Sequence, residues 1–404
     1  MKLLCVFGRH NYGDPARGEG YEYSNFLPAL RALGHEVHHF ESWDRNAHAD
    51  FAALNLALLD RVDTLHPDLV FCVLMGYEVW TETLRTLRLG GVRVLNWGTD
   101  DSWKYPQFSR HVAPEVDLWA TTSHLALERA RADGLQNVRL SQWAASGART
   151  AEPLASEDCR YDVSFIGSAY GNRGRWIARL KARGLHVECF GQGWPNGPVD
   201  AARIPEIYRC SRISLNFGDS GLQWRGLVPY RSRQIKARVF EVPAAGGCLL
   251  TEQAERLNDY YKSGVEMETF ADEDSLIDRA RVLLAEPERR DAMAWAGYRR
   301  TIREHLYEGR FGVLLGEPEV RNADAAPGHR LDRDLFMRAL ADHRTDAGLQ
   351  FLRKIMVWPL QRIWGERRGA RAARRLLFEL SWRLCGRATY KASGLPGRLF
   401  YRES

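Results

Sequence analysis

Short apolar runs alternate with amphipathic stretches over the first 140 residues. The runs that predict strands lie at 3–7, 37–40, 69–75, 92–97 and 118–121. A helix is expected at about 21–33, with Gly34 as its stop. The run at 69–75 is typical of a strand buried on both faces. Strands that alternate with helices indicate a parallel, doubly wound sheet.

The same pattern starts again after a stretch at 144–160 that loses its periodicity. Its predicted strands lie at 161–166, 187–190, 213–217 and 248–250. Helices are expected from about Arg173, over about 233–244, and at 274–284. The sequence therefore predicts an α/β protein with two doubly wound units. The expected division is a first unit at 1–145, a linker at 146–160, a second unit at 161–318 and a helical extension at 319–404.

Composition excludes several classes of protein. The chain has 404 residues, with 45% hydrophobic and 27% charged side chains, as in globular proteins. No apolar run reaches the length of a membrane span, and residues 1–8 predict a strand and a glycine turn rather than a signal peptide. Seven cysteines without metal-ligand spacing indicate reduced thiols, so we expect a cytoplasmic protein.

The C-terminal part of the chain is strongly basic. Residues 351–404 contain 13 Lys or Arg and 3 Asp or Glu, although the whole chain has a net charge of only +6. Trp358 and Trp364 stand among basic residues in a stretch broken by Pro359, and residues 370–384 place a leucine stripe beside arginines. This pattern favours attachment to an anionic membrane surface. A helix packed on the domain with solvated arginines is the alternative, and no recognised fold supports nucleic-acid binding.

The segment 234–252 combines cations, a carboxylate and a glycine pair ahead of a strand. Lys236 and Arg238 can meet a diphosphate, and Glu241 can accept hydrogen bonds from ribose hydroxyls. Gly246 and Gly247 are expected to let the next backbone approach the same ligand, and Thr251 is a further candidate for donor binding. Alternatively, Arg238 and Glu241 pair on a helix surface, although their apolar neighbours make a solvated face a poor fit.

Two glycine turns follow predicted strands of the second unit. The first contains Gly167 and Ser168 and leads to the helix that starts at Arg173, which could offer backbone N–H groups to a phosphate. The second contains Gly191, Gln192 and Gly193 and could contact a base or a sugar. For each turn the alternative is structural: an ordinary strand-to-helix turn, and a glycine turn with a packed tryptophan.

Candidates for catalysis follow strands of the first unit. Asp100 and Asp101 come after the strand at 92–97, where cleft residues of such sheets lie, and either could act as a base. The alternative is a helix cap. His10 lies in a glycine-rich polar loop and is a further possible base, although a lone histidine more often completes a hydrogen-bond network. Two adjacent carboxylates without a further cluster do not predict a metal site.

Residues 239–251, Val-Phe-Glu-Val-Pro-Ala-Ala-Gly-Gly-Cys-Leu-Leu-Thr, resemble the donor-site segment of GT-B glycosyltransferases, especially the CgeB-like branch with its glycosyl transferases group 1 C-terminal domain. Other segments that resemble this branch lie at 96–101, 161–168, 208–216 and 305–310. The resemblance covers about 1–318. It implies two facing Rossmann-like domains, with the acceptor on the first and a nucleotide sugar on the second.

At the level of residues, the resemblance implies that Glu241 holds the donor ribose and that Lys236 and Arg238 meet its diphosphate. Related retaining enzymes carry another glutamate eight residues earlier, where this chain has Arg233. The expected function is metal-independent transfer of a sugar to a cell-envelope glycan or lipid-linked saccharide at the inner face of the membrane, with retention of configuration and no cofactor. The alternative is a non-catalytic nucleotide-sugar-binding scaffold of a glycan assembly complex.

Overall fold

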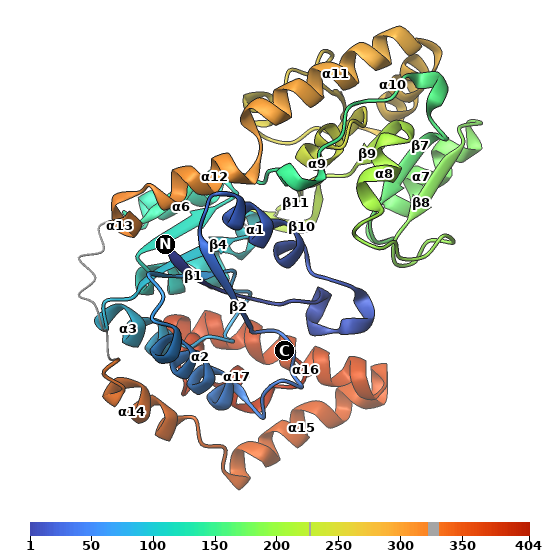
Figure 1. Ribbon diagram of the computed structural model, residues 1–404. Coiled ribbons are helices and arrows are strands. Elements are labelled where there is room, and N and C mark those ends of the chain that lie inside the picture. The colour runs from blue at the N-terminus through green and yellow to red at the C-terminus, as the bar shows by residue number, and fades with distance from the viewer. Residues whose placement is uncertain (226–227, 322–330) are drawn as a thin grey trace. The chain divides into compact units, whose positions relative to one another are not determined.

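The structure is a computed structural model that describes residues 1–225, 228–321 and 331–404; of residues 220–225 and 228–232 only the backbone is described (Figure 1). The chain forms two units. The first consists of Met1–Tyr23, Gly34–Ser141 and Leu314–Ser404, and the second of Ser24–Leu33 and Gln142–Val313. This differs from the predicted division, because the expected linker belongs to the second unit and the expected extension to the first.

The first unit is built on a parallel sheet with the strand order β2-β1-β3-β4-β5-β6. Its strands are β1 Lys2–Phe7, β2 Glu36–Glu41, β3 Leu69–Cys72, β4 Arg93–Gly98, β5 Leu118–Thr121 and β6 Val138–Leu140. All four residues of β3 are buried, as its apolar sequence predicts. The doubly wound fold predicted for this part of the chain is confirmed.

Helices connect these strands and supply most of the surrounding core. They are α1 Tyr21–Ala32, α2 Phe51–Leu65, α3 Thr81–Leu89, α4 Asp101–Lys104, α5 Arg110–Val112 and α6 His124–Ala132. Asp50 caps α2 by accepting a hydrogen bond from the Ala53 amide, which is one of the donors that a helix start leaves unsatisfied. Only the first three residues of α1, Tyr21–Tyr23, group with this unit. Tyr21 and Glu22 therefore lie at the end of the loop that connects β1 to α1.

The second unit has a parallel sheet with the order β13-β12-β9-β7-β8. Its strands are β7 Tyr161–Ile166, β8 Val187–Phe190, β9 Ser211–Asn216, β12 Leu249–Glu252 and β13 Glu268–Phe270. An antiparallel hairpin of β10 Asp219–Arg225 and β11 Val228–Arg233 follows β9. The sequence analysis does not predict this hairpin. It occupies the place where the helix at 233–244 was expected to begin.

The helices of the second unit are α7 Arg173–Ala182, α8 Ile204–Arg209, α9 Arg238–Ala244, α10 Glu273–Ala285, α11 Pro287–Glu304 and α12 Tyr307–Leu315, the last of which ends in the first unit. Helix α9 is shorter than predicted, because Arg233 ends a strand and Lys236 precedes the helix. Helix α10 begins at a capping box formed by Asp272 and Ser275. Its apolar stripe faces the core, as its periodicity predicts.

The remaining helices are α13 Pro318–Arg321, α14 Asp334–Asp342, α15 Ala347–Trp364, α16 Glu366–Cys385 and α17 Leu395–Leu399. Figure 1 shows α15 and α16 lying side by side, and a Cβ atom at Gly369 would approach the backbone of Gln361 to 2.4 Å. Helix α15 continues through Pro359, so the predicted break at this proline is wrong. No helix of the described residues is long and apolar enough to cross a membrane.

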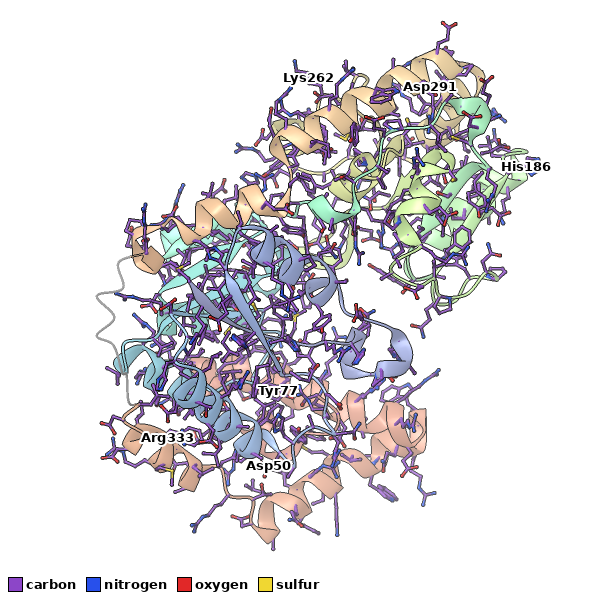
Figure 2. The ribbon with its side chains drawn as sticks, in the orientation of Figure 1. Asp50, Tyr77, His186, Lys262, Asp291 and Arg333 are labelled. Atoms are coloured by element: carbon purple, nitrogen blue, oxygen red, sulfur yellow. The ribbon has the colours of Figure 1, made fainter. Side chains whose placement is uncertain are left out.

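The C-terminal helices pack on the core of the first unit. Phe336, Tyr390 and Tyr401 belong to the same buried cluster as strands β1, β3 and β4. Arg333, labelled in Figure 2, forms ion pairs with Asp60 and Asp63 of α2. This part of the chain is therefore a component of the first unit and not a separate appendage.

Candidate functional site

Two glycine turns meet at the carboxyl edge of the second sheet. The Ala169 amide donates to the Gln192 carbonyl at 2.8 Å, and the Trp194 indole donates to the Gly167 carbonyl at 2.7 Å. Gly167 has a φ of 151°, and a Cβ atom at Gly191 would lie 2.5 Å from the Gly167 carbonyl oxygen. Only glycine allows this approach. The structure thus brings together Gly167, Ser168, Gly191, Gln192 and Gly193, and it packs Trp194 beneath them.

Arg173, the first residue of α7, is almost fully buried beside these turns. Its guanidinium donates to the Ser168 carbonyl at 2.9 Å and stacks 3.9 Å from the centre of the Tyr170 ring. Its Nε atom has no hydrogen-bond partner within the described residues. Burial, with the nearby charge of Arg238, lowers the pKa of Arg173 to about 10. A buried cation with an unused donor fits an anionic ligand.

Arg238, the first residue of α9, reaches the same place from another element. Its Nη2 atom would lie 2.6 Å from a Cβ atom at Gly167, and its Nη1 atom donates to the Asn216 side chain at 3.2 Å. Arg238 and Arg173 both lie over the Phe165 ring, at 5.6 and 5.4 Å. Asp219, which is nearly buried, offsets part of this positive charge. The edge of the sheet therefore holds two neighbouring guanidinium groups at a turn without side chains.

Glu241 lies one turn after Arg238 on α9 and is partly buried. It lines a small cavity together with Arg149 and Tyr208. Burial raises the pKa of Glu241, and the guanidinium groups of Arg238 and Arg149 oppose this rise. Its neighbours Val239 and Phe240 are buried, so the helix is not the solvated face of the alternative interpretation. A carboxylate held among cations can accept hydrogen bonds from paired hydroxyl groups.

Other residues of the predicted donor segment lie elsewhere. Gly246 and Gly247 follow the C-terminal end of α9, where added Cβ atoms would approach the Ala151 and Tyr208 carbonyls to 2.7 and 2.8 Å. Their role is therefore close packing of protein backbone, and the expectation that they admit a ligand is corrected. Thr251 is buried and accepts a hydrogen bond from Asn216 at 2.9 Å, so it supports the residue that positions Arg238. Lys236 is partly buried just ahead of α9.

Arg233 is held by a carboxylate that the sequence analysis does not single out. Its Nε atom lies 2.8 Å from Glu252 at the end of β12, and its Nη2 atom donates to the Ala271 carbonyl at 2.8 Å. Glu252 is nearly buried and also accepts from the Gly218 amide at 2.9 Å. Burial raises the pKa of Glu252, opposed chiefly by Arg233. Arg233 thus brings the Glu252 carboxylate to the same sheet edge.

Asp101, a predicted base of the first unit, is part of the buried scaffold. One oxygen accepts from the Ser109 hydroxyl at 2.5 Å and the other from the Trp119 indole at 2.9 Å. Only 2% of the residue is exposed. Burial raises the pKa of its carboxyl group, and these hydrogen bonds oppose the rise. A carboxylate whose oxygens are occupied in the core does not face a substrate. The prediction that Asp101 is catalytic is therefore corrected to a structural role.

Asp100 and His10 remain near the carboxyl edge of the first sheet. Asp100 stands before α4, makes no side-chain cap, and lies 3.7 Å from the Lys104 amine. His10 forms a backbone bridge with Glu19, and its Nδ1 atom has no partner within the described residues. Asp100 lines a cavity of this unit with Glu22, whereas His10 is not among the lining residues.

Glu22 is a functional candidate that the sequence analysis misses. It stands in the first turn of α1 and is partly buried. Burial, together with the Asp100 charge, raises the pKa of Glu22 to about 7. The hydrogen bond from its own backbone amide and the positive charge of Lys104 oppose this rise. A glutamate directly after the glycine-rich loop of the first strand was the available signal, because such loops face the site in doubly wound sheets.

Glu22 makes the stability of the protein depend on pH. Its folded pKa of about 7 exceeds the ordinary 4.5, so the folded state holds the extra proton between these values. The free energy of unfolding therefore falls as pH rises through that window. We expect Glu22→Gln to stabilise the chain by roughly 1–3 kcal/mol at pH 8 and little at pH 5, in denaturant melts. An equal effect at both pH values would contradict this, and Glu128→Gln on the exposed face of α6 is the control.

Metal ligands are not clustered in the described parts of the chain. No group of three or more His, Cys, Asp or Glu in those ranges is arranged to hold an ion. Metal-independent chemistry stays a prediction.

The sequence matches a known protein family over residues 173–316, and the description of that family is "Glycosyl transferase-like". Residues 173–316 are a glycosyl transferase-like domain. A comparison with curated proteins found no match. The matched range contains Arg173, Arg238 and Glu241, and it thus covers most of the site on the second sheet.

Solved structures show the same fold for most of this chain. Sucrose-phosphate synthase from Thermosynechococcus elongatus superposes with a TM-score of 0.57 and 12% identity, over 78% of this chain and 98% of that one. HepE from Anabaena, in complex with UDP-glucose, gives a TM-score of 0.51 and 10% identity, over 78% of this chain and 100% of that one. The predicted GT-B fold is confirmed. The family match concerns residues 173–316 alone, and the function of the chain is addressed below.

Proposed function

We propose that this protein is a glycosyltransferase that takes its sugar from a nucleoside diphosphate sugar bound at the carboxyl edge of the second sheet. The observation that carries the proposal is the pair Arg173 and Arg238, two neighbouring guanidinium groups at the Gly167 turn, one of them with an unused buried donor. A diphosphate supplies the charge and the acceptor oxygens that this pair lacks. Glu241 then accepts hydrogen bonds from the ribose hydroxyls.

The same residues favour cleavage of the donor. As the bond between the sugar's anomeric carbon and the diphosphate oxygen breaks, its electron pair leaves with the diphosphate. Arg173 and Arg238 stabilise the negative charge that grows there, and this requires no metal ion. The resemblance of residues 239–251 to the family supports retention of configuration. HepE, which shares the fold, forms complexes with UDP and UDP-glucose, so a uridine nucleotide is the first donor to test.

A panel of UDP-, GDP- and ADP-sugars tests the function, with release of nucleoside diphosphate as the measurement. We expect one of these donors to be consumed by the full chain and expect Glu241→Ala to reduce turnover about tenfold or more, because ribose contacts are lost. Nucleotide binding without turnover of any donor, with saccharide and lipid-linked acceptors present, would favour the non-catalytic scaffold. Unchanged binding and turnover in Glu241→Ala would contradict the assigned site.

We further propose that the acceptor is a cell-envelope glycan or a lipid-linked saccharide, and that the protein works as a cytoplasmic protein on the inner face of the membrane. Sixteen large apolar side chains are exposed in the described residues, and nine of them lie on α15 and α16. Phe351, Ile355 and Trp358 follow helical spacing on α15, as do Leu376, Leu380 and Leu384 on α16. Exposed arginines, including Arg362 and Arg383, stand beside both stripes.

An exposed apolar stripe flanked by cations supports insertion into an anionic lipid surface. We expect the full chain to float with vesicles that contain phosphatidylglycerol and not with phosphatidylcholine alone. Trp358→Ser with Ile363→Ser should reduce flotation severalfold, because both side chains are more than half exposed and carry little of the core. Leu89→Ser, equally exposed on α3, is the matched control. Equal flotation of all three proteins would contradict membrane attachment through α15.

A further inference from the structure

A cavity of about 550 Å³ opens in the first unit, and the C-terminal helix α16 forms one of its walls. The loops after β1, β3 and β4 contribute other walls, together with the start of α1 at Glu22. Ligands of doubly wound sheets bind at this edge. The cavity is large enough for a mono- or disaccharide-sized ligand. All of its lining residues belong to the first unit, whereas Arg173 and Arg238 belong to the second.

Helix α16 is fixed in this position by several contacts. Phe378 lies 5.7 Å from the Tyr77 ring, which is labelled in Figure 2, and the Tyr77 hydroxyl is 2.9 Å from the Ser404 hydroxyl. Tyr390, just after α16, donates to the Gln107 carbonyl and packs 5.4 Å from the Phe108 ring. The arginines that α16 brings to the cavity are therefore held there by the core.

Three buried N–H donors on residues that line the cavity have no hydrogen-bond partner within the described residues. They are the indole nitrogen of Trp43 and the Nε atoms of Arg45 and Arg374. A buried donor without a partner costs free energy, so such groups usually meet an acceptor. Arg375 and Lys104 line the same cavity and add positive charge. Carboxylates also line the cavity, but Glu78 accepts from the Met75 amide and Glu379 pairs with Arg383, so neither neutralises the arginines of α16. The unused donors and these arginines favour a ligand that carries anionic oxygen atoms.

The other lining groups suit a polyhydroxylated ligand. Glu22 and Asp100 offer carboxylate oxygens as acceptors for hydroxyl groups. Two aromatic rings of the lining, Tyr12 and Trp103, provide apolar faces against which the C–H face of a sugar ring can pack. Tyr12 is 80% exposed, so its ring is available to a ligand. A free anion alone would make no use of these rings and acids.

We propose that this cavity binds the acceptor as a phosphorylated saccharide, with the arginines of α16 on the phosphate and with Glu22 and Asp100 on the sugar hydroxyls. This inference rests on the proposed function, because it supplies that reaction with its second substrate. It gives α16 a role in acceptor recognition in addition to the exposed leucine stripe on its other side. The phosphate could belong to a soluble sugar phosphate or to a polyprenyl phosphate sugar.

The test uses the full chain saturated with UDP, and inorganic phosphate as the probe, followed by broadening of its ³¹P NMR signal. We expect Arg374→Gln to weaken phosphate binding about tenfold or more, because a charge-assisted contact is lost. Arg371→Gln, an exposed arginine of α16 away from the cavity, should bind as the unaltered chain does. Melting temperature and UDP affinity show whether each variant is folded. Should Arg374→Gln not fold, Arg375→Gln is expected to weaken phosphate binding severalfold.

Phosphate that fails to bind the UDP-saturated chain would overturn the proposal, as would unchanged binding in both Arg374→Gln and Arg375→Gln. Failure of UDP to bind is a separate result, which contradicts the donor site and leaves the dependence on Arg374 as the test of the cavity. Hexose 6-phosphate and a polyprenyl-phosphate hexose in micelles are then compared as competitors. Displacement of phosphate by either supports the proposal and identifies the source; displacement by neither overturns the saccharide part.

Discussion

Replacement of Arg238 by methionine should lower the affinity of the full chain for UDP about 10- to 100-fold, as measured by titration calorimetry. The substitution keeps most of the side-chain volume and removes the guanidinium that lies against Gly167 and is anchored by Asn216. The diphosphate would then lose a charge-assisted contact, and Arg173 alone would face it. The loss should appear in binding and again in turnover.

Arg299→Met is the matched control, since Arg299 is exposed on α11 of the same unit. It should leave the affinity for UDP unchanged. If Arg238→Met binds UDP as tightly as the unaltered chain, the nucleotide site lies elsewhere. If both variants bind weakly, the effect reflects net charge and not the turn at Gly167.

Arg290→Met should destabilise the second unit by about 3–5 kcal/mol. Arg290 is fully buried on α11 and donates to the Arg212, Leu154 and Ser211 carbonyls at 2.7, 2.8 and 2.8 Å. It also pairs with Asp291, labelled in Figure 2, at 2.9 Å. Methionine would fill the space and leave three carbonyl groups without these donors. Arg290 thereby ties α11 to β9 and to the segment that enters the second sheet.

Chemical denaturation of Arg290→Met, with Arg299→Met as the control, measures this effect. The control should change the free energy of unfolding by less than about 0.5 kcal/mol, as expected of an exposed site. A loss below about 1 kcal/mol in Arg290→Met would mean that water or other donors replace the guanidinium. Such a result would contradict its role as a connector within the unit.

Much of the fold follows from local patterns. Strands at 118–121, 161–166 and 187–190 have the predicted bounds, since a short apolar run between turn residues leaves few alternatives. The hairpin of β10 and β11 was missed because its residues carry no clear alternation. Pro359 was expected to end a helix, yet α15 continues through it. Docking of the C-terminal helices depends on aromatic contacts more than 250 residues apart in the sequence, such as Phe108 with Tyr390, and no local pattern reports these.

The candidate site was predictable in part for a similar reason. Glycine turns after strands and the cations ahead of Glu241 have local signatures, and the structure brings Gly167, Arg173 and Arg238 together. Asp101 carries the same signature as a catalytic acid, but Trp119 and Ser109 occupy its oxygens, and only tertiary structure reveals this. Arg374 lies about 350 residues from Glu22, so the cavity that they share could not be inferred from spacing.

Arg233 stands where the resemblance to retaining GT-B enzymes implies a glutamate, and in the structure it forms an ion pair with Glu252. The ion pair of Arg233 with Glu252 brings a carboxylate to the same edge of the sheet from β12. Arg233 is therefore compatible with the proposed donor site.

A crystal structure of the full chain soaked with UDP tests the central claim most directly. The account predicts diphosphate oxygens within hydrogen-bond distance of the guanidinium groups of Arg173 and Arg238. It also predicts the ribose hydroxyls at the Glu241 carboxylate. Ordered UDP in any other place, with the Gly167 turn empty, would contradict the assignment of the donor site to the second sheet.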